Sequence, residues 1–145
     1  MKLNIIKTSV ISLMFIVVSP IYADTEGKII VGKDVEMNNI SKKEIENIFL
    51  GRQTMWDNGK RIKIAISANK SDKMDAFYSE YIGKTSSRFK KYWLKKVFAG
   101  YGVAPKLFKD SDRIMSFVKK EGSSIALVMS DEIKDANGIK VIDIE

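Results

Sequence analysis

The segment from Ser41 to Gly51 carries both the start signal and the stop signal of a helix. Ser41 and Glu44 have the spacing of a capping box, in which each side chain accepts a hydrogen bond from the other residue's amide. Ile40 before the cap can pack against Ile45 as a hydrophobic staple. Gly51 can adopt the left-handed conformation that ends many helices. The segment therefore predicts a short amphipathic helix with defined ends, and the flanking segments must fit around it.

Strand-like segments lie on both sides of this expected helix. Residues 28–32 are a short apolar run rich in β-branched side chains. Residues 61–67 alternate isoleucine with lysine or alanine, which is the period of a strand with one buried face. Residues 57–59 form a turn, because Asn and Gly tolerate positive φ, and we expect Trp56 before it to close over one end of the core.

The rest of the sequence continues to alternate helical and extended patterns. We expect three amphipathic helices and two strands, at residues 72–82, 87–99, 110–121, 124–129 and 139–144 respectively. Ser71 or Asp72 can cap the first of these helices, and Asp110 or Ser111 can cap the third. Strands separated by helices predict an α/β sandwich with a mixed sheet flanked by helices.

The N-terminus has the pattern of a secretory signal peptide. Two lysines precede an apolar run at residues 10–18, which is too short to span a bilayer, and Ala23 is a small residue at a plausible cleavage point. We expect a signal peptide over residues 1–23, cleaved before Asp24, and one mature domain over residues 24–145 with no stable membrane span. An uncleaved membrane anchor is the alternative, and an intact-mass measurement would separate the two.

The composition argues against an enzyme and against a metal site. The chain has no cysteine and no histidine, which excludes thiol nucleophiles, Ser-His-Asp sets and the usual zinc ligands. Two pairs of acids, Asp72 with Asp75 and Asp110 with Asp112, are explained more simply as carboxylates at helix starts. We therefore expect a protein without catalytic residues, metal or cofactor.

The formal charge of +7 favours anionic partners, although surplus lysines can also serve only solubility. Export argues against nucleic acid as the partner. Arg88, Lys91 and Lys95 form a basic stripe on the helix expected at residues 87–99, and a solvated face is the simpler explanation of that stripe. The same helix has a broad apolar arc made of Phe89, Trp93, Leu94, Val97 and Phe98.

Three segments resemble, in order and spacing, the phosphate-binding proteins of phosphate ABC transporters, and more closely their short single-lobe relatives. Residues 41–59 resemble the family segment "lskeel..IFlGk...W.dG", and residues 92–105 resemble "yW...vFtGkg..P". Residues 123–128 stand where the family has "GaIGYv", with Ser, Ala and Leu in place of its two glycines and tyrosine. The likeness covers roughly residues 28–130. It implies a periplasmic, single-lobe type II periplasmic-binding-protein-like domain.

The resemblance also implies a binding loop. In the two-lobed relatives, an "R.DGSGT" motif after the strand that residues 61–67 resemble holds phosphate with amides and hydroxyls at a helix start. The corresponding residues here lack the Gly-Ser-Gly-Thr part, and a lysine in this loop lacks the bidentate geometry of arginine. The candidate ligand-binding residues are Ser67, Asn69 (near the expected arginine), Lys70, Ser71, Asp72 and Lys73.

Two functions stay open. The first is binding of inorganic phosphate or a related small anion, linked to phosphate uptake and a transporter. We expect such binding to be weak, because the chain has no room for the second lobe and the anion would stay largely hydrated. The second is a ligand-free interaction module on the same scaffold, which would bind another envelope protein through the helix at residues 87–99 or through Arg52 and Tyr101.

Overall fold

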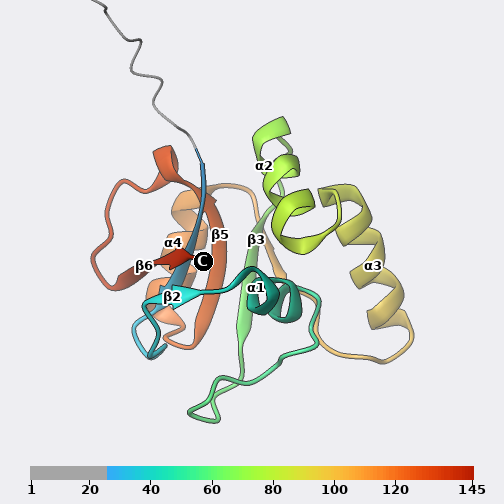
Figure 1. The fold of residues 1–145 in the computed structure, drawn as a ribbon, viewed down its shortest axis with the longest axis horizontal. Coiled ribbons are helices and arrows are strands. Elements are labelled where there is room, and N and C mark those ends of the chain that lie inside the picture. Colours follow the sequence, from blue (N-terminus) through green and yellow to red (C-terminus); the bar gives the residue numbers. More distant parts are fainter. Residues whose placement is uncertain (1–25) are drawn as a thin grey trace, which may run out of the picture.

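The structure is a computed structural model that describes residues 26–145, so the predicted signal peptide lies outside the described residues. A six-stranded mixed sheet in the order β2-β6-β1-β5-β3-β4 carries helices on both faces (Figure 1). The predicted α/β class with a mixed sheet is confirmed. The strands are β1 (Gly27–Gly32), β2 (Asn39–Ile40), β3 (Lys63–Ser67), β4 (Lys106–Phe108), β5 (Ser124–Met129) and β6 (Ile139–Ile144). The helices are α1 (Lys42–Phe49), α2 (Asp72–Phe77), the π-helical turn η1 (Tyr78–Ile82), α3 (Ser86–Phe98), α4 (Ser111–Lys120) and the 3-10 turn η2 (Ser130–Glu132).

Strand β5 lies in the middle of the sheet, as its unbroken apolar sequence predicts. It pairs antiparallel with β1 and parallel with β3, and all six of its residues are buried. On the outer sides, β6 pairs antiparallel with β1, β4 pairs parallel with β3, and β2 pairs parallel with β6. The sequence patterns did not predict β2 and β4, because two or three residues are too few to show a period.

Two hydrophobic clusters cover the two faces of the sheet. The larger one joins α1, α2, η1 and α3 to side chains of β1, β3 and β5, and the smaller one lies under α4. In β3, Ile66 belongs to the first cluster and Ala65 to the second, and both are buried. The expectation that this strand has a single buried face was therefore wrong, because helices cover both sides of it.

The ends of α1 are those that the sequence predicts. Ser41 and Glu44 form the capping box, with the Glu44 carboxylate accepting from the Ser41 amide over 2.9 Å. Gly51 follows the helix with a φ of 65°. A Cβ at this position would lie 2.5 Å from the Trp93 ring, so the turn and the packing both require glycine. Trp56, in the loop that follows, is buried over one end of the core and donates from Nε1 to the Ser123 carbonyl over 2.7 Å.

The segment expected as one helix over residues 72–82 changes its winding in the middle. Ser71 caps the α-helical part, which ends at Phe77, and η1 continues to the left-handed Gly83 with a φ of 73°. Asp110 is the cap of α4. None of the helices in residues 26–145 is long and apolar enough to cross a bilayer.

Helix α3 is attached to the molecule through one part of its apolar arc. Phe89 and Trp93 are buried, but Leu94, Val97 and Phe98 are 60%, 43% and 84% exposed. Only part of the apolar arc that the sequence predicts is therefore buried. Figure 1 shows α3 at the outer edge of its layer, where no further element covers it. The basic stripe on this helix is exposed, as expected of a solvated face.

Polar side chains of α3 also connect it to the end of α1. Trp93 Nε1 donates to the Phe49 carbonyl over 2.9 Å, and the Tyr92 hydroxyl donates to the Leu50 carbonyl over 2.7 Å. Lys96 Nζ donates to the carbonyls of Leu50 and Gly51 over 2.9 and 3.1 Å. Carbonyls at a helix end lack intrahelical donors, and α3 supplies those donors here.

Candidate functional site

The candidate site is the loop that joins the end of β3 to the start of α2. At its beginning, Ser67 Oγ accepts from the Asn69 amide over 3.0 Å, and the Ala68 amide donates to a carbonyl of β4 over 2.7 Å. At its other end, Ser71 Oγ accepts from the Met74 amide over 3.1 Å. The loop is thus held at both ends, and the helical start predicted near Ser71 is present.

Two backbone amides at this helical start are free. The amides of Met74 and Asp75 donate to the hydroxyl and the carbonyl of Ser71, whereas those of Asp72 and Lys73 have no acceptor within residues 26–145. Amides in a first helical turn are suitable donors for an anion. However, the Asp72 carboxylate lies in the same turn and opposes a second negative charge. The loop therefore offers main-chain donors in an exposed and partly unfavourable electrostatic setting.

A side-chain carboxylate occupies the neighbouring helix start. Asp75 Oδ1 accepts from the Ser86 amide over 3.1 Å, in the first turn of α3. The hydroxyl and the amide of Ser86 hold the pKa of the Asp75 carboxyl below its ordinary value, and the charges of Lys70 and Lys90 act in the same direction. The start of α3 is thus already occupied by the Asp75 carboxylate. Of the two helix starts, only the start of α2 is open to an external anion.

The six predicted residues lie in one segment, from the last residue of β3 to the first turn of α2, but they do not enclose a common point. The Ser67 hydroxyl is engaged by Asn69. Lys70 lies close enough to Asp75 to lower the pKa of that carboxyl, whereas Lys73 lines a separate pocket beside the start of β1. Asn69 and the four residues after it are all exposed. The structure therefore places the predicted residues together in the chain without building an enclosed cavity from them.

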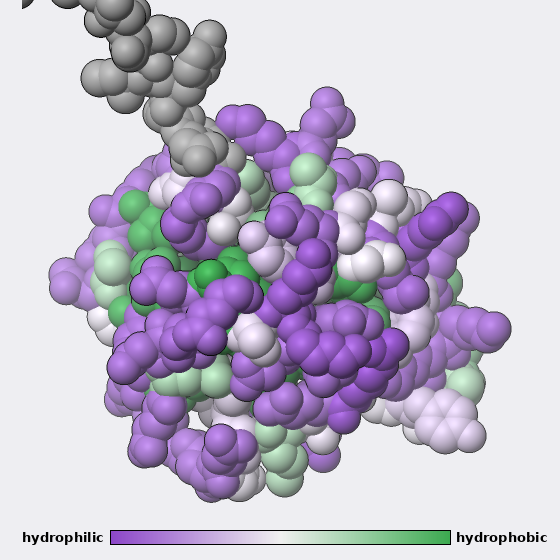
Figure 2. Space-filling view, in the orientation of Figure 1, coloured by the Kyte–Doolittle hydropathy of each residue, from purple (hydrophilic) through white to green (hydrophobic). Residues whose placement is uncertain are grey.

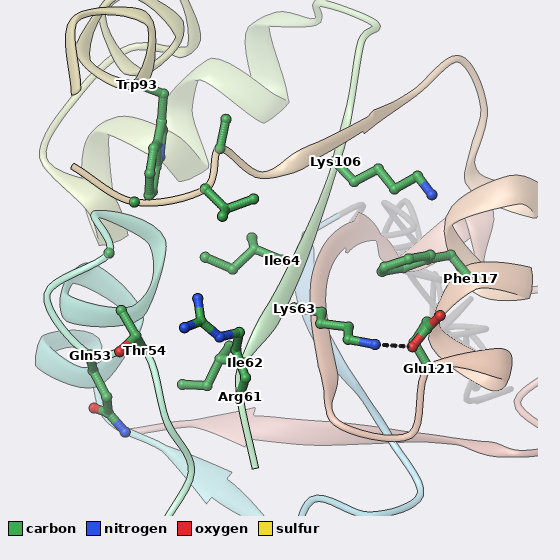
Figure 3. Close-up of a pocket in the computed structure, with 14 residues that line it drawn as sticks. Gln53, Thr54, Arg61, Ile62, Lys63, Ile64, Trp93, Lys106, Phe117 and Glu121 are labelled. Carbon is green, nitrogen blue, oxygen red and sulfur yellow. Dashed lines mark hydrogen bonds and ion pairs between the residues drawn. The ribbon is translucent and has the colours of Figure 1, made fainter. Parts of the chain in front are cut away.

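A cavity of about 410 Å³ lies at the β4 side of β3, and the sequence did not predict it (Figure 3). Strand β4 pairs with β3 only from Ala65 onward, so the first residues of β3 have an open edge there. Residues 102–104, Trp93 of α3 and Phe117 of α4 are also part of the lining, as are residues of the loop after α1. No local pattern could have marked this cavity, because its walls come from segments far apart in the sequence.

Three cations line the cavity, and one of them is neutralised. Lys63 forms an ion pair with Glu121 of α4 (Figure 3), and this contact holds the pKa of the Glu121 carboxyl below its ordinary value. Arg61 lines the same cavity and has no hydrogen bond or ion pair in the described part of the chain. Lys106 Nζ lies 5.2 Å from the centroid of the Phe117 ring. Arg61 is therefore a second place, outside the loop, where an anion could be held.

The described residues contain no group of three acidic, histidine or cysteine side chains that could hold a metal ion.

Comparison by sequence finds no protein-family model and no curated protein that matches the chain. Comparison by structure finds similar folds. One is PstS from Borrelia burgdorferi, with a TM-score of 0.63 at 12% identity. The match covers 83% of the present chain and 47% of the PstS chain. Another, from Clostridium perfringens, is a protein assigned as a phosphate ABC transporter substrate-binding protein and solved with bound phosphate; it has a TM-score of 0.62 at 14% identity, over 83% of this chain and 45% of that one.

A third similar structure is an ABC-type phosphate transport receptor from Vibrio cholerae, with a TM-score of 0.55 at 11% identity, over 83% of this chain and 46% of that one. These three neighbours are substrate-binding or transport-receptor proteins rather than enzymes. The present chain spans less than half the length of each of them. The resemblance seen in the sequence is thus confirmed at the level of the fold: the chain has the fold of part of a phosphate ABC transporter substrate-binding protein.

Proposed function

We propose that the protein is an exported, non-enzymatic binding protein that takes phosphate or a related small anion at the loop from Ser67 to Lys73. The observation that carries the proposal is the pair of free amides at Asp72 and Lys73 on a fold whose solved neighbours include a phosphate-bound protein. Lys70 and Lys73 add positive charge on this loop. We also propose that this binding is linked to phosphate uptake and to a transporter.

Binding at this loop is expected to be weak. The site is one-sided and exposed, so a bound anion keeps most of its water and each new hydrogen bond replaces one that water already made. The Asp72 carboxylate adds repulsion. We expect a dissociation constant on the order of 1 mM or more, sensitive to salt, unless a second molecule closes over the loop.

Isothermal titration of residues 24–145 with phosphate and with sulfate tests the proposal. We expect a small heat that the double variant Lys70→Gln/Lys73→Gln abolishes and that Arg61→Gln leaves intact. Arg61→Gln removes a free cation that lines the cavity, so it is the matched control for location. Loss of heat in Arg61→Gln alone would move the site to the cavity, and no heat at millimolar anion would refute anion binding altogether.

Export to the periplasm is also part of the proposed function. The predicted cleavage before Asp24 gives a mature protein in the periplasm, and intact-mass analysis of a periplasmic fraction tests it. A full-length mass in the membrane fraction would instead support the uncleaved anchor.

A second candidate function is an interaction module of the cell envelope. It is favoured by the exposed Leu94 and Phe98, which lie on the same helix as the basic stripe Arg88, Lys91 and Lys95. A pull-down from envelope extract with the wild-type chain, compared with a variant that reverses the three charges of the stripe, tests this candidate. Unchanged partners would rule out the stripe as the docking surface.

A further inference from the structure

Positive charge is concentrated in one part of the molecule. Between Tyr81 and Lys109 the chain has eight lysines and arginines and no acidic residue. The formal charge of the whole chain is +7, so the remainder is close to neutral. This segment is α3 with the residues just before it and the connection that leads through β4 toward α4. We call it the basic segment.

The cations of the basic segment form no ion pairs within the described residues. None of the eight forms an ion pair with any residue from 26 to 145, whereas cations elsewhere do, such as Lys60 with Asp34 and Lys119 with Asp135. Two of the eight, Lys90 and Lys96, donate to backbone carbonyls. The cations of the basic segment are Lys84, Arg88, Lys90, Lys91, Lys95, Lys96, Lys106 and Lys109.

Apolar side chains share the outer face of α3 with these cations. Lys91, Leu94, Lys95 and Phe98 stand at i, i+3, i+4 and i+7, so they lie on one side of the helix, and all four are exposed. In the connection that follows, Tyr101 and Val103 are 69% and 77% exposed. In Figure 2 hydrophilic side chains project from the margin of the molecule where Figure 1 places α3.

We infer that this face of α3, together with the connection after it, docks on the surface of an anionic phospholipid bilayer. This inference gives the surface of α3 a lipid partner in place of the envelope protein of the second candidate function, and it does not depend on anion binding at the Ser67–Lys73 loop. Exposed aromatic and aliphatic tips can enter the headgroup region while neighbouring cations meet lipid phosphates. Phe98 and Val103 are more than three-quarters exposed, which suits immersion of single side chains in lipid. Export, which the N-terminal sequence predicts, would bring the protein to such surfaces.

Vesicle sedimentation with the signal-processed chain tests the inference. We expect binding to phosphatidylcholine vesicles that contain about one-third phosphatidylglycerol, no binding to pure phosphatidylcholine, and release at high salt. The variant Lys91→Glu/Lys95→Glu should lower the partition coefficient about 25-fold or more, since each surface cation contributes about fivefold. Lys33→Glu/Lys42→Glu makes the same charge change at exposed positions outside the basic segment and should have a much smaller effect.

Fluorescence tests the depth of insertion. Trp56 and Trp93 are both buried, so a new tryptophan in Phe98→Trp reports on the exposed face of α3. We expect its emission to shift to the blue with anionic vesicles and to stay unchanged with neutral ones.

Three outcomes would overturn the inference. Equal losses in the two charge variants would mean that net charge alone drives binding. No shift of Phe98→Trp would mean that the apolar tips stay in water. No vesicle binding, together with an envelope protein that the wild type captures and Lys91→Glu/Lys95→Glu does not, would make the occupant an acidic protein. The anion site is tested separately, because Lys70→Gln/Lys73→Gln should lose phosphate heat and keep vesicle binding.

Discussion

Helices α3 and α4 have similar sequences in outline and very different surroundings. Each starts at a side-chain cap and has two lysines in its last turn. Helix α4 packs on β1, β3 and β5 and buries its apolar residues Ile114, Met115 and Val118. Helix α3 stands at the edge of the other layer and leaves Leu94 and Phe98 in solvent. The helical period identifies which residues share a face, but the neighbouring layer decides how much of that face is covered.

The largest difference should appear on truncating one apolar residue in each helix. We expect Ile114→Ala to lower the free energy of unfolding by about 3 kcal/mol, because it leaves a cavity between α4 and the sheet. Leu94→Ala removes a comparable volume from solvent and should change it by less than about 0.5 kcal/mol. Urea unfolding of both variants measures the contrast. Similar losses in the two would mean that α3 is covered after all.

A smaller effect is expected at the contact that holds α3. Trp93→Phe loses buried ring area and the hydrogen bond to the Phe49 carbonyl, and should lower the free energy of unfolding by about 2 kcal/mol. Tyr92→Phe is the matched control, because Lys96 also donates to the Leu50 carbonyl and keeps it satisfied. In urea unfolding, the free energy of unfolding should be clearly lower for Trp93→Phe than for Tyr92→Phe. A reversed order would show that the hydroxyl, and not the indole, anchors the helix.

The next largest effect on stability is expected on removing the Asp75 charge at the start of α3. Asp75→Asn should lower the melting temperature at neutral pH, because the carboxylate accepts from the Ser86 amide there. The Ser86 hydroxyl and then its amide hold the pKa of Asp75 below the ordinary 3.8, so the charged form stabilises the fold above that value. This contribution is lost as the pH falls through the lowered pKa. Melting curves from neutral to strongly acidic pH should show the difference between variant and wild type shrinking, and a constant difference would contradict the assignment.

The smallest effect on stability is expected at the tip of α3. Phe98→Ser should leave the free energy of unfolding within about 0.5 kcal/mol of wild type, since this side chain is almost fully exposed. The same variant should reduce binding to anionic vesicles. A large loss of stability in urea would contradict the exposed position of the residue.

The sequence was a good guide where the determinants are local. Residues within four positions of one another make the capping box at Ser41, the cap at Ser71 and the left-handed Gly51, and all three are present. The apolar run at residues 125–129 of β5 likewise indicates its central place, because a strand covered on both faces has few polar positions. The resemblance in three spaced segments led to the correct fold.

The sequence was a poor guide where distant segments meet. The exposure of Phe98 depends on where α3 lies relative to the sheet, and the cavity beside Arg61 depends on the course of residues 102–104. The change to π-helical winding at Tyr78 has no sequence signal that we can name. The candidate loop from Ser67 to Lys73 is a prediction that the structure makes more specific, by leaving the amides of Asp72 and Lys73 free, but does not test.

The donors that α3 supplies to the end of α1 have a dynamic consequence. Detachment of α3 from the rest of the molecule would remove, in one step, the side-chain donors that bind the carbonyls of Phe49, Leu50 and Gly51. Fraying of α1 from its C-terminal end and detachment of α3 are therefore coupled events. In native-state hydrogen exchange the two helices should behave as one cooperative unit, with a common opening free energy below that of the strands at the centre of the sheet.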